Sequence, residues 1–331
     1  MRRRPAADGR PGRPGCPGRR PRPGRPRTAA GLLGACLLLG GCGLGAGGTP
    51  AGVQLTVTRD FGATGLAERA APAVHGSDTA MRLLERNARV ATAFGGGFVA
   101  SIDGLAGGRE AGRPVDWFFY VNGIEATQGA AATTLHDGDH VWWDRHDWGA
   151  TMTVPAVVGA FPEPFLHGTE GKRLPVRIEC LDPASPACDR VAHQLTAIGI
   201  PAGRGGLGLA EHDAALRVLV GTWPRLRTDA AARRLESGPA ASGVYVRVAG
   251  GGRSLVLLDA RGAAVRTLGP HSGLVAATRL ADAPPVWIVT GTDDAGVAAA
   301  AQAFEPGALH DRFALAVSSA DQGVPLPVAG R

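Results

Sequence analysis

The segment from His140 to His146 alternates ionisable or aromatic side chains with apolar ones. Successive side chains of an extended strand point to opposite faces, so Val141 and Trp143 suit an inward face. The outward face would carry His140, Trp142, Asp144 and His146. Two imidazoles, a carboxylate and an indole on one exposed face can form a binding surface. The alternative, of equal weight, is a solvated strand rim, because edge strands often carry charges.

A metal site can also be drawn from His140, Asp144 and His146. Same-face neighbours two positions apart lie about 6.5–7 Å from each other, a spacing that is workable but unspecific. We therefore predict no metal and no required cofactor.

A second aromatic run extends from Asp116 to Asn122. In a strand, Trp117 and Phe119 share one face, and Phe118 and Tyr120 share the other with Asn122. Both faces are apolar, so a helix would cover one, and the second half of the chain or a ligand the other. Trp117 and Phe119 are predicted core residues, whereas Phe118 and Tyr120 suit core and ligand equally. Trp148, just past the later strand, is expected in the connector or between the two halves. The candidate ligand-binding residues are Phe118, Tyr120, Asn122, His140, Trp142, Asp144, His146 and Trp148.

No nucleophile elbow, zinc-protease motif or Walker loop occurs in the sequence. Gly203–Gly208 fits the dinucleotide-binding string, but it follows a predicted helix and precedes a strand, the reverse of the required context. Gly221-Thr222 and Thr290–Asp294 end predicted strands and could hold an anion, although helix capping is favoured. We predict that the chain is not an enzyme, and leave the second half open on this point.

The amino-terminal 41 residues contain ten arginines and one aspartate, followed by a short apolar run that ends at Leu39-Gly-Gly-Cys42. A basic flank, a short apolar core and small residues are the layout of a secretory signal peptide. The final four residues resemble the lipobox of bacterial lipoproteins, in which the cysteine receives the lipid. We therefore predict a signal peptide over 1–41, lipidation of Cys42, a flexible tether over 42–52, and a location on the outer face of the cell membrane.

The net charge of +6 belongs to this leader. Removing its charged residues from the totals of 35 basic and 29 acidic leaves 25 and 28, a net charge of −3. A nucleic-acid partner would need a basic face on the folded part, and none is evident. Two further cysteines, Cys180 and Cys188, flank a turn-rich loop, and in an oxidising compartment they are predicted to form a disulfide.

Two regions of different character follow the tether. The first, 53–150, contains a strand near Val53–Val57, a helix that begins near Ser77, and four strand signals, which are Phe98–Ile102, Asp116–Asn122, a weaker one at Ala126–Leu135, and His140–His146. Asn122-Gly123 predicts a tight hairpin, and the aspartates of Asp137-Gly-Asp139 are predicted turn formers. This order implies one helix crossing a small, mostly antiparallel sheet.

The second region, 174–320, follows a connector over 151–173 and precedes a flexible tail over 321–331. Its predicted strands are Pro175–Cys180, Leu216–Gly221, Val244–Val248, Leu255–Asp259 and Val286–Thr290, and its predicted helices are Asp189–Ile198, Asp229–Ser237 and Ala295–Phe304. Alternation of this kind predicts a three-layer α/β domain. The hairpin-like pair over 244–259 would make its sheet mixed.

The first region resembles the transcobalamin-like C-terminal domain family. The resemblance is carried by Asp116-Trp-Phe-Phe-Tyr-Val-Asn-Gly123, Leu135-His-Asp-Gly-Asp139, Val141-Trp-Trp143 and the upstream helix Ala80–Leu84. It implies a β-grasp-like α+β module over 53–150 and suggests cobalamin as a ligand. The second region resembles no family closely enough to transfer residues.

Together these features predict a cell-surface lipoprotein that binds an extracellular ligand, with cobalamin or another corrinoid as the candidate. Delivery to a membrane importer would follow from such a role. The alternative is a structural or adhesive surface protein that binds other proteins through the aromatic module.

Overall fold

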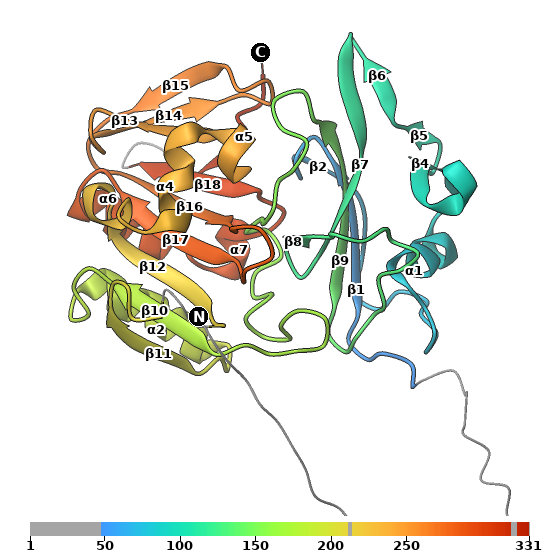
Figure 1. Cartoon of the computed structure of the whole chain (residues 1–331), viewed down its shortest axis with the longest axis horizontal. Helices are drawn as coiled ribbons and strands as arrows, with labels where there is room; N and C mark the ends of the chain where they lie inside the picture. Colours follow the sequence, from blue (N-terminus) through green and yellow to red (C-terminus); the bar gives the residue numbers. More distant parts are fainter. Residues whose placement is uncertain (1–47, 211–213, 319–322, 331) are drawn as a thin grey trace, which may run out of the picture. The chain divides into compact units, whose positions relative to one another are not determined.

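The computed structural model describes residues 48–210, 214–318 and 323–330. The predicted signal peptide and Cys42 lie outside these residues. The described part of the chain is a strand-rich α+β structure with four sheets and short helices (Figure 1). None of its helices is both long enough and apolar enough to cross a membrane.

The first sheet has the strand order β2-β1-β9-β7-β6, with β8 paired to β7. Strand β1 runs parallel to β9, and the other pairs are antiparallel. Its strands are β1 (Gln54–Arg59), β2 (Thr64–Arg69), β6 (Gly108–Glu110), β7 (Arg113–Val121), β8 (Ile124–Glu125) and β9 (His140–Asp147). Asn122 and Gly123 both have positive φ, as a tight turn between β7 and β8 requires.

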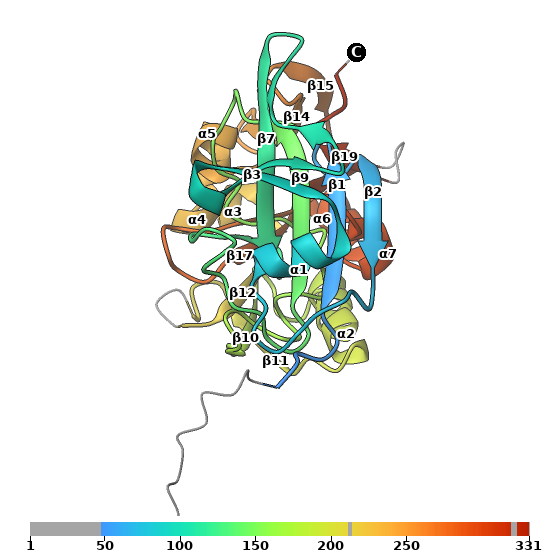
Figure 2. The ribbon, with the colours of Figure 1, turned by 90° about the vertical axis from the view of Figure 1, so that its right-hand side faces the viewer.

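Helix α1 (Ala80–Asn87) lies across one face of this sheet (Figure 2). Thr79 caps its amino terminus by accepting a hydrogen bond from the Arg82 amide. The helix buries Met81 and Leu84 against the core residues that β1, β7 and β9 turn toward it. Beside it lies a small antiparallel sheet made of β3 (Val90–Ala93), β4 (Phe98–Ile102) and β5 (Leu105–Ala106), with a short 3-10 turn, η1 (Phe94–Gly96), between β3 and β4.

The second large sheet has the order β11-β10-β12-β17-β16-β18-β19. Strands β11, β10, β12 and β17 are parallel to one another. Strands β16, β18 and β19 join by antiparallel pairing. The strands are β10 (Val176–Cys180), β11 (Ala202–Gly206), β12 (Leu216–Thr222), β16 (Ser272–Thr278), β17 (Val286–Gly291), β18 (Ala314–Ser318) and β19 (Val324–Leu326).

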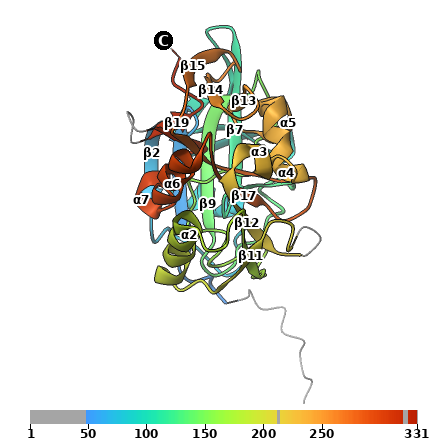
Figure 3. The same ribbon diagram turned by 90° about the vertical axis from the view of Figure 1, so that its left-hand side faces the viewer.

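The two faces of this sheet have different covers. Helices α2 (Pro186–Ala197) and α6 (Asp294–Gln302) pack on one face, with α7 (Pro306–Leu309) nearby (Figure 3). The other face meets short helices and a three-stranded meander. These are α3 (Trp223–Leu226), α4 (Ala230–Arg233), η2 (Arg234–Ser237), α5 (Pro239–Ser242), β13 (Val246–Ala249), β14 (Ser254–Leu258) and β15 (Ala264–Leu268).

Several predictions about elements need correction. The stretch 126–135 forms no strand beyond a single bridge between Thr79 and Thr134. The pair over 244–259 belongs to the separate β13–β15 sheet, so the large sheet is mixed because of β16, β18 and β19 instead. Within the predicted tail, β19 pairs with β18, which ties residues 324–326 to the sheet edge.

The disulfide between Cys180 and Cys188 is present, as predicted. It joins the end of β10 to the first turn of α2, where Ser185 caps the helix. The described residues form one compact unit, in which the first and second regions share a continuous packed interior.

Candidate functional site

The strand alternation predicted for β9 is observed. Val141 and Trp143 face α1, while Trp142 joins the core that faces the second sheet. The second face is not exposed, however. His140, Trp142, Asp144 and His146 are all buried, because β18 and the segments around it cover this side of the first sheet. The outward surface proposed from the sequence is therefore buried between the first and second sheets. We call this buried layer, which contains Trp142, Asp144 and His146 of β9, the seam.

At the centre of the seam is the buried carboxylate of Asp144. It accepts hydrogen bonds from the Thr58 hydroxyl at 2.5 Å and from the amides of Phe61 and Gly62 at 3.0 and 2.9 Å. His146 Nδ1 lies 2.8 Å from Asp144 Oδ1. The Trp142 indole donates to the same Thr58 hydroxyl at 2.7 Å. This carboxylate has its acceptor positions filled by the protein itself.

Aromatic rings complete the seam. The His146 ring is stacked between Phe61 and Phe118, with both ring centroids 4.4 Å away. Phe313, next to β18, meets this group edge-on, at 5.1 Å from Phe61 and 5.3 Å from Trp142. Tyr120 and Tyr245 are also buried here. These rings are in the geometry of a packed core, and both faces of the His146 ring are covered by Phe61 and Phe118.

His140 and Asn122 have structural partners at the opposite end of β9. His140 Nε2 lies 2.8 Å from the Thr56 hydroxyl, and burial lowers the pKa of His140 to about 4. Asn122 donates to Asp139 Oδ1 at 2.9 Å and to the Gly168 carbonyl at 2.8 Å. Within the residues that the structure describes, no three His, Cys, Asp or Glu side chains group as metal ligands would.

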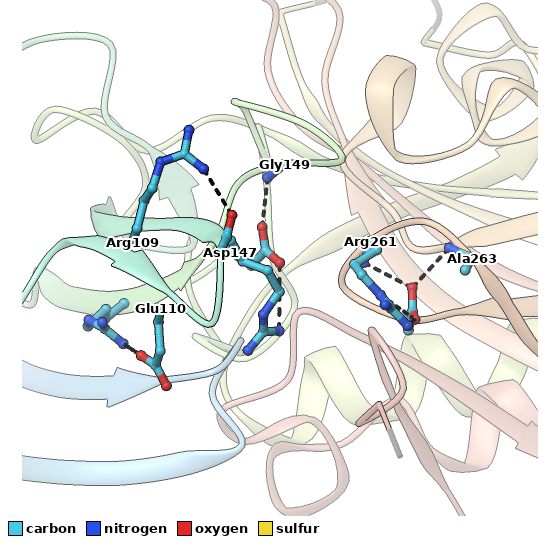
Figure 4. A network of polar contacts seen from close by, with 10 residues as sticks. Arg109, Glu110, Asp147, Gly149, Arg261 and Ala263 are labelled. Atoms are coloured by element: carbon cyan, nitrogen blue, oxygen red, sulfur yellow. Dashed lines mark hydrogen bonds and ion pairs between the residues drawn. The ribbon is translucent and has the colours of Figure 1, made fainter.

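Trp148 lies apart from the other candidates, beyond the end of β9. Its indole donates to Asp116 Oδ2 at 2.9 Å. Ion pairs and turns surround this end of the sheet (Figure 4): Asp147 accepts from the Gly149 amide at 2.8 Å, and Glu110 pairs with Arg145 at 2.7 Å. Of the two strand-end motifs of the second sheet, Thr290–Asp294 caps a helix as favoured, since Asp293 accepts from the Gly296 amide at the start of α6. Thr222 precedes α3 but makes no side-chain cap hydrogen bond.

A cleft of about 720 Å³ lies at the β7–β8 end of the seam. We call it the cleft. Three segments line it: the hairpin and loop within 121–139, the connector within 169–174, and the β16–β17 loop within 279–285. Its volume is in the range of small-molecule sites. None of the eight candidate residues taken from the sequence lines it.

Two carboxylates in the cleft are partly or fully buried. Burial raises the pKa of Glu125 to about 7, against the opposing effects of the Val154 amide and of Arg279. Burial also raises the pKa of Asp139, which accepts from the His136 amide at 2.7 Å and from Asn122. The turn-forming role predicted for Asp139 is thus observed, in a buried setting. Perturbed carboxylates that line a cleft mark a candidate functional site.

An acid–histidine pair, Glu163 with His167, lies beside the turn before β9, where a Cβ on Gly138 would meet the His167 ring. Glu163 Oε1 is 2.6 Å from His167 Nδ1, and burial raises the pKa of Glu163, with Asp139 contributing to the same direction. On the cleft wall, His136 Nδ1 lies 3.5 Å from Asp139 Oδ2. Acids and histidines from two distant segments therefore meet at this end of the seam.

Sequence reasoning missed Glu125. The signal available was a single carboxylate two residues after the Asn122-Gly123 turn, in an otherwise apolar stretch. A strand pattern places such a residue on a face but does not say which distant loop will bury it.

Replacing Asp144 with alanine would leave the amides of Phe61 and Gly62 buried without an acceptor. We expect the free energy of unfolding to fall by about 3–5 kcal/mol, measured by urea denaturation. Asp189→Ala is the control, because that carboxylate is 61 % exposed and pairs with Arg204 on the surface. It should cost less than about 1 kcal/mol. Equal losses in the two variants would show that Asp144 does not hold the seam.

Glu125→Gln keeps the side-chain shape and removes the charge. Since the folded-state pKa is about 7 and the ordinary value is 4.5, the folded protein binds the extra proton between these pH values. Stability should therefore fall as pH rises through this window, and the cost is complete above it. We expect the variant to be more stable than the parent by about 1–3 kcal/mol above neutral pH, and the difference to shrink in acid.

The measurement is urea denaturation of both proteins at several pH values. Glu85→Gln, on the exposed side of α1, is the matched control for the loss of one carboxylate. A difference for Glu125→Gln that is constant with pH would contradict the burial argument.

Comparison with known families gives a match over part of the first region. Residues 77–147, from before α1 to the end of β9, match the family model described as "Domain of unknown function (DUF4430)". A search of curated proteins finds no match. Neither result names a cobalamin-binding protein.

Among solved structures, the chain is similar to a candidate metal-binding protein from Ruminococcus gnavus, at 17 % identity and a TM-score of 0.23. The similarity covers 29 % of this chain and 97 % of that one. We draw no conclusion on fold or function from it. The chain is similar to the DUF4430 family through the segment that builds α1 and the central strands of the first sheet.

Proposed function

We propose that this chain is an exported, lipid-anchored protein that holds a small extracellular ligand in the cleft. The observation that carries the proposal is the cleft itself, where Glu125 and Asp139 are held in a partly buried setting by segments from distant parts of the chain. Buried carboxylates with raised pKa values cost stability, and proteins accept such a cost mainly at functional sites. The leader and Cys42 support the export and the anchor.

The cleft is a better ligand site than the aromatic strand face. The strand face has Asp144 fully hydrogen-bonded and its rings packed against each other, so a ligand there would have to separate the two sheets. The cleft is open to solvent and presents polar and apolar side chains together. Sites that bind small molecules combine these properties.

Finer assignments follow from the sequence. We propose that the first sheet and α1 form a β-grasp-like module, and that the second sheet with its two covers forms a three-layer α/β domain. The transcobalamin-like resemblance supports a corrinoid as the first ligand to test, with delivery to an importer as the role. A corrinoid is much larger than a drug-sized ligand, so it would be held at one edge by the cleft.

A second candidate function is attachment to another protein. Phe94 and Phe98 flank a run of three glycines; they are 90 % and 37 % exposed, with their rings 6.1 Å apart. Neighbouring exposed aromatic side chains are typical of contact surfaces. This surface replaces the buried face of β9 as the place where the first region would bind a partner.

The lipid anchor has a direct test. Cys42→Ala should leave the leader uncleaved and abolish labelling by a fatty acid in an expressing bacterium, because the thiol is the lipid acceptor. Cys36→Ala, six residues earlier in the apolar run, is the matched control and should be labelled normally. Labelling that persists in Cys42→Ala would refute the anchor.

Ligand binding is tested by calorimetric titration of the purified protein with cobalamin and with cobinamide. One-to-one binding by either ligand should be lost in Ala132→Trp, which places a large ring in the cleft, and retained in Ala184→Trp, on an exposed loop outside it. Binding that survives Ala132→Trp would exclude the cleft as the site. No heat with either ligand would reject the corrinoid and leave other small ligands to be tested.

A further inference from the structure

The charged residues that line the cleft are predominantly acidic. Four carboxylates line it, from Glu125, Asp139, Glu170 and Asp282. The permanent cations there are Lys172 and Arg279, and His136 is the remaining ionisable group. When His136 is neutral and the four carboxylates and two cations are all ionised, the lining has a net charge of −2. An anionic ligand would add to this charge, whereas a cationic ligand would offset it.

The cations that line the cleft form no ion pair with Glu125 among the described residues. Arg279 NH2 lies 3.6 Å from the exposed Asp282, and Lys172 is itself exposed. Arg279 acts on Glu125 through space, and the Val154 amide is the hydrogen-bond donor identified for the carboxylate.

Glu125 is surrounded by groups from several elements. Tyr120, its cross-strand partner on β7, has a buried hydroxyl without a hydrogen-bond partner in the described structure. Arg279 and Asp282 come from the β16–β17 loop. From the remaining walls come His136 and Asp139 of the turn before β9, and Glu170 and Lys172 of the connector. A donor that enters the cleft would be the first direct cationic partner of this carboxylate.

The size and apolar part of the cleft point to an organic cation. Ile124, Leu174, Pro284 and Pro285 supply apolar wall between the charged groups. Such surface packs against methylene groups. A metal ion needs several convergent ligands, and the described residues contain no group of three that could supply them.

We propose that the ligand of the cleft is a small alkyl amine, bound by an ammonium group at the carboxylate of Glu125, beside the negative charge of Asp139, and by its methylene groups along the apolar wall. This proposal rests on the proposed function, since it names a ligand class for the same site. The amine is an alternative to the corrinoid there, and the titrations decide between them. A diamine fits best, because one ammonium would pair with Glu125 while the second would meet the exposed carboxylates of Glu170 and Asp282, which also line the cleft.

Binding of an ammonium is linked to ionisation of Glu125. The ammonium favours the carboxylate form, so binding below the pKa of about 7 must first remove a proton. Affinity should therefore rise with pH, and from about pH 5.5 to about pH 8 the expected gain is about thirtyfold. An anion that binds through Arg279 would show the opposite trend.

The test is calorimetric titration of the purified protein with three ligands of equal chain length: 1,4-diaminobutane, 1,4-butanediol and succinate. We expect saturable binding of the diamine, with the diol and the dicarboxylate weaker by at least about tenfold. Glu125→Gln should weaken diamine binding by about tenfold and flatten its pH dependence. Because this variant is expected to be more stable than the parent, lost binding would not reflect unfolding.

Glu85→Gln is the matched control and should bind the diamine as the parent does. Ala132→Trp should block the diamine if the cleft is the site. Absence of diamine binding, or equal binding of the diol, would overturn the amine class. Binding of succinate or cobinamide that Ala132→Trp abolishes would overturn it too, while leaving the cleft as a ligand site. Diamine binding that Ala132→Trp leaves intact would instead overturn both proposals.

Discussion

The buried carboxylate of Asp144 is the interaction on which the arrangement of the two sheets depends. A carboxylate can remain in an apolar interior only when hydrogen bonds replace its water. Asp144 meets this condition by drawing the turn after β1 and the side chain of His146 to itself. That turn places Phe61 on one side of the His146 ring, opposite Phe118. The resulting stack of rings is the surface on which Phe313 of the second half packs.

This seam explains why the ligand site is expected elsewhere. The aromatic rings of the seam pack across the two sheets, and its ionisable groups are hydrogen-bonded. They are therefore not exposed to a ligand. The cleft forms at the end of the seam, where the β7–β8 hairpin, the connector and the β16–β17 loop meet. Its buried carboxylates oppose folding, and the packed seam is the nearby source of stability that offsets them. Under the proposed function, stability and ligand binding therefore belong to adjacent parts of one interface.

The sequence predicts the local structure of this interface well and its covering poorly. Period-two alternation placed Trp142 and Trp143 on opposite faces, and the Asn122-Gly123 turn and the Cys180–Cys188 bridge were identified from spacing and residue type. What covers each face depends on contacts such as Phe61 with Phe313, between residues far apart in the chain. No local pattern encodes that pairing. The same limitation hid Glu125, whose burial is imposed by the connector and the β16–β17 loop.

Backbone packing fixes the walls of the cleft before any ligand arrives. Gly123 has positive φ, and a Cβ there would lie 2.9 Å from the Val157 carbonyl oxygen, so the hairpin turn rests directly on the connector. Gly138 also has positive φ, and a Cβ there would overlap the His167 ring. These two contacts hold the β7–β8 hairpin and the turn before β9 against one segment. Since Glu125 follows the first turn and Asp139 ends the second, their separation is set by the fold. A ligand that pairs with Glu125 beside Asp139 would gain affinity from this preorganisation, because little ordering is left for binding to impose.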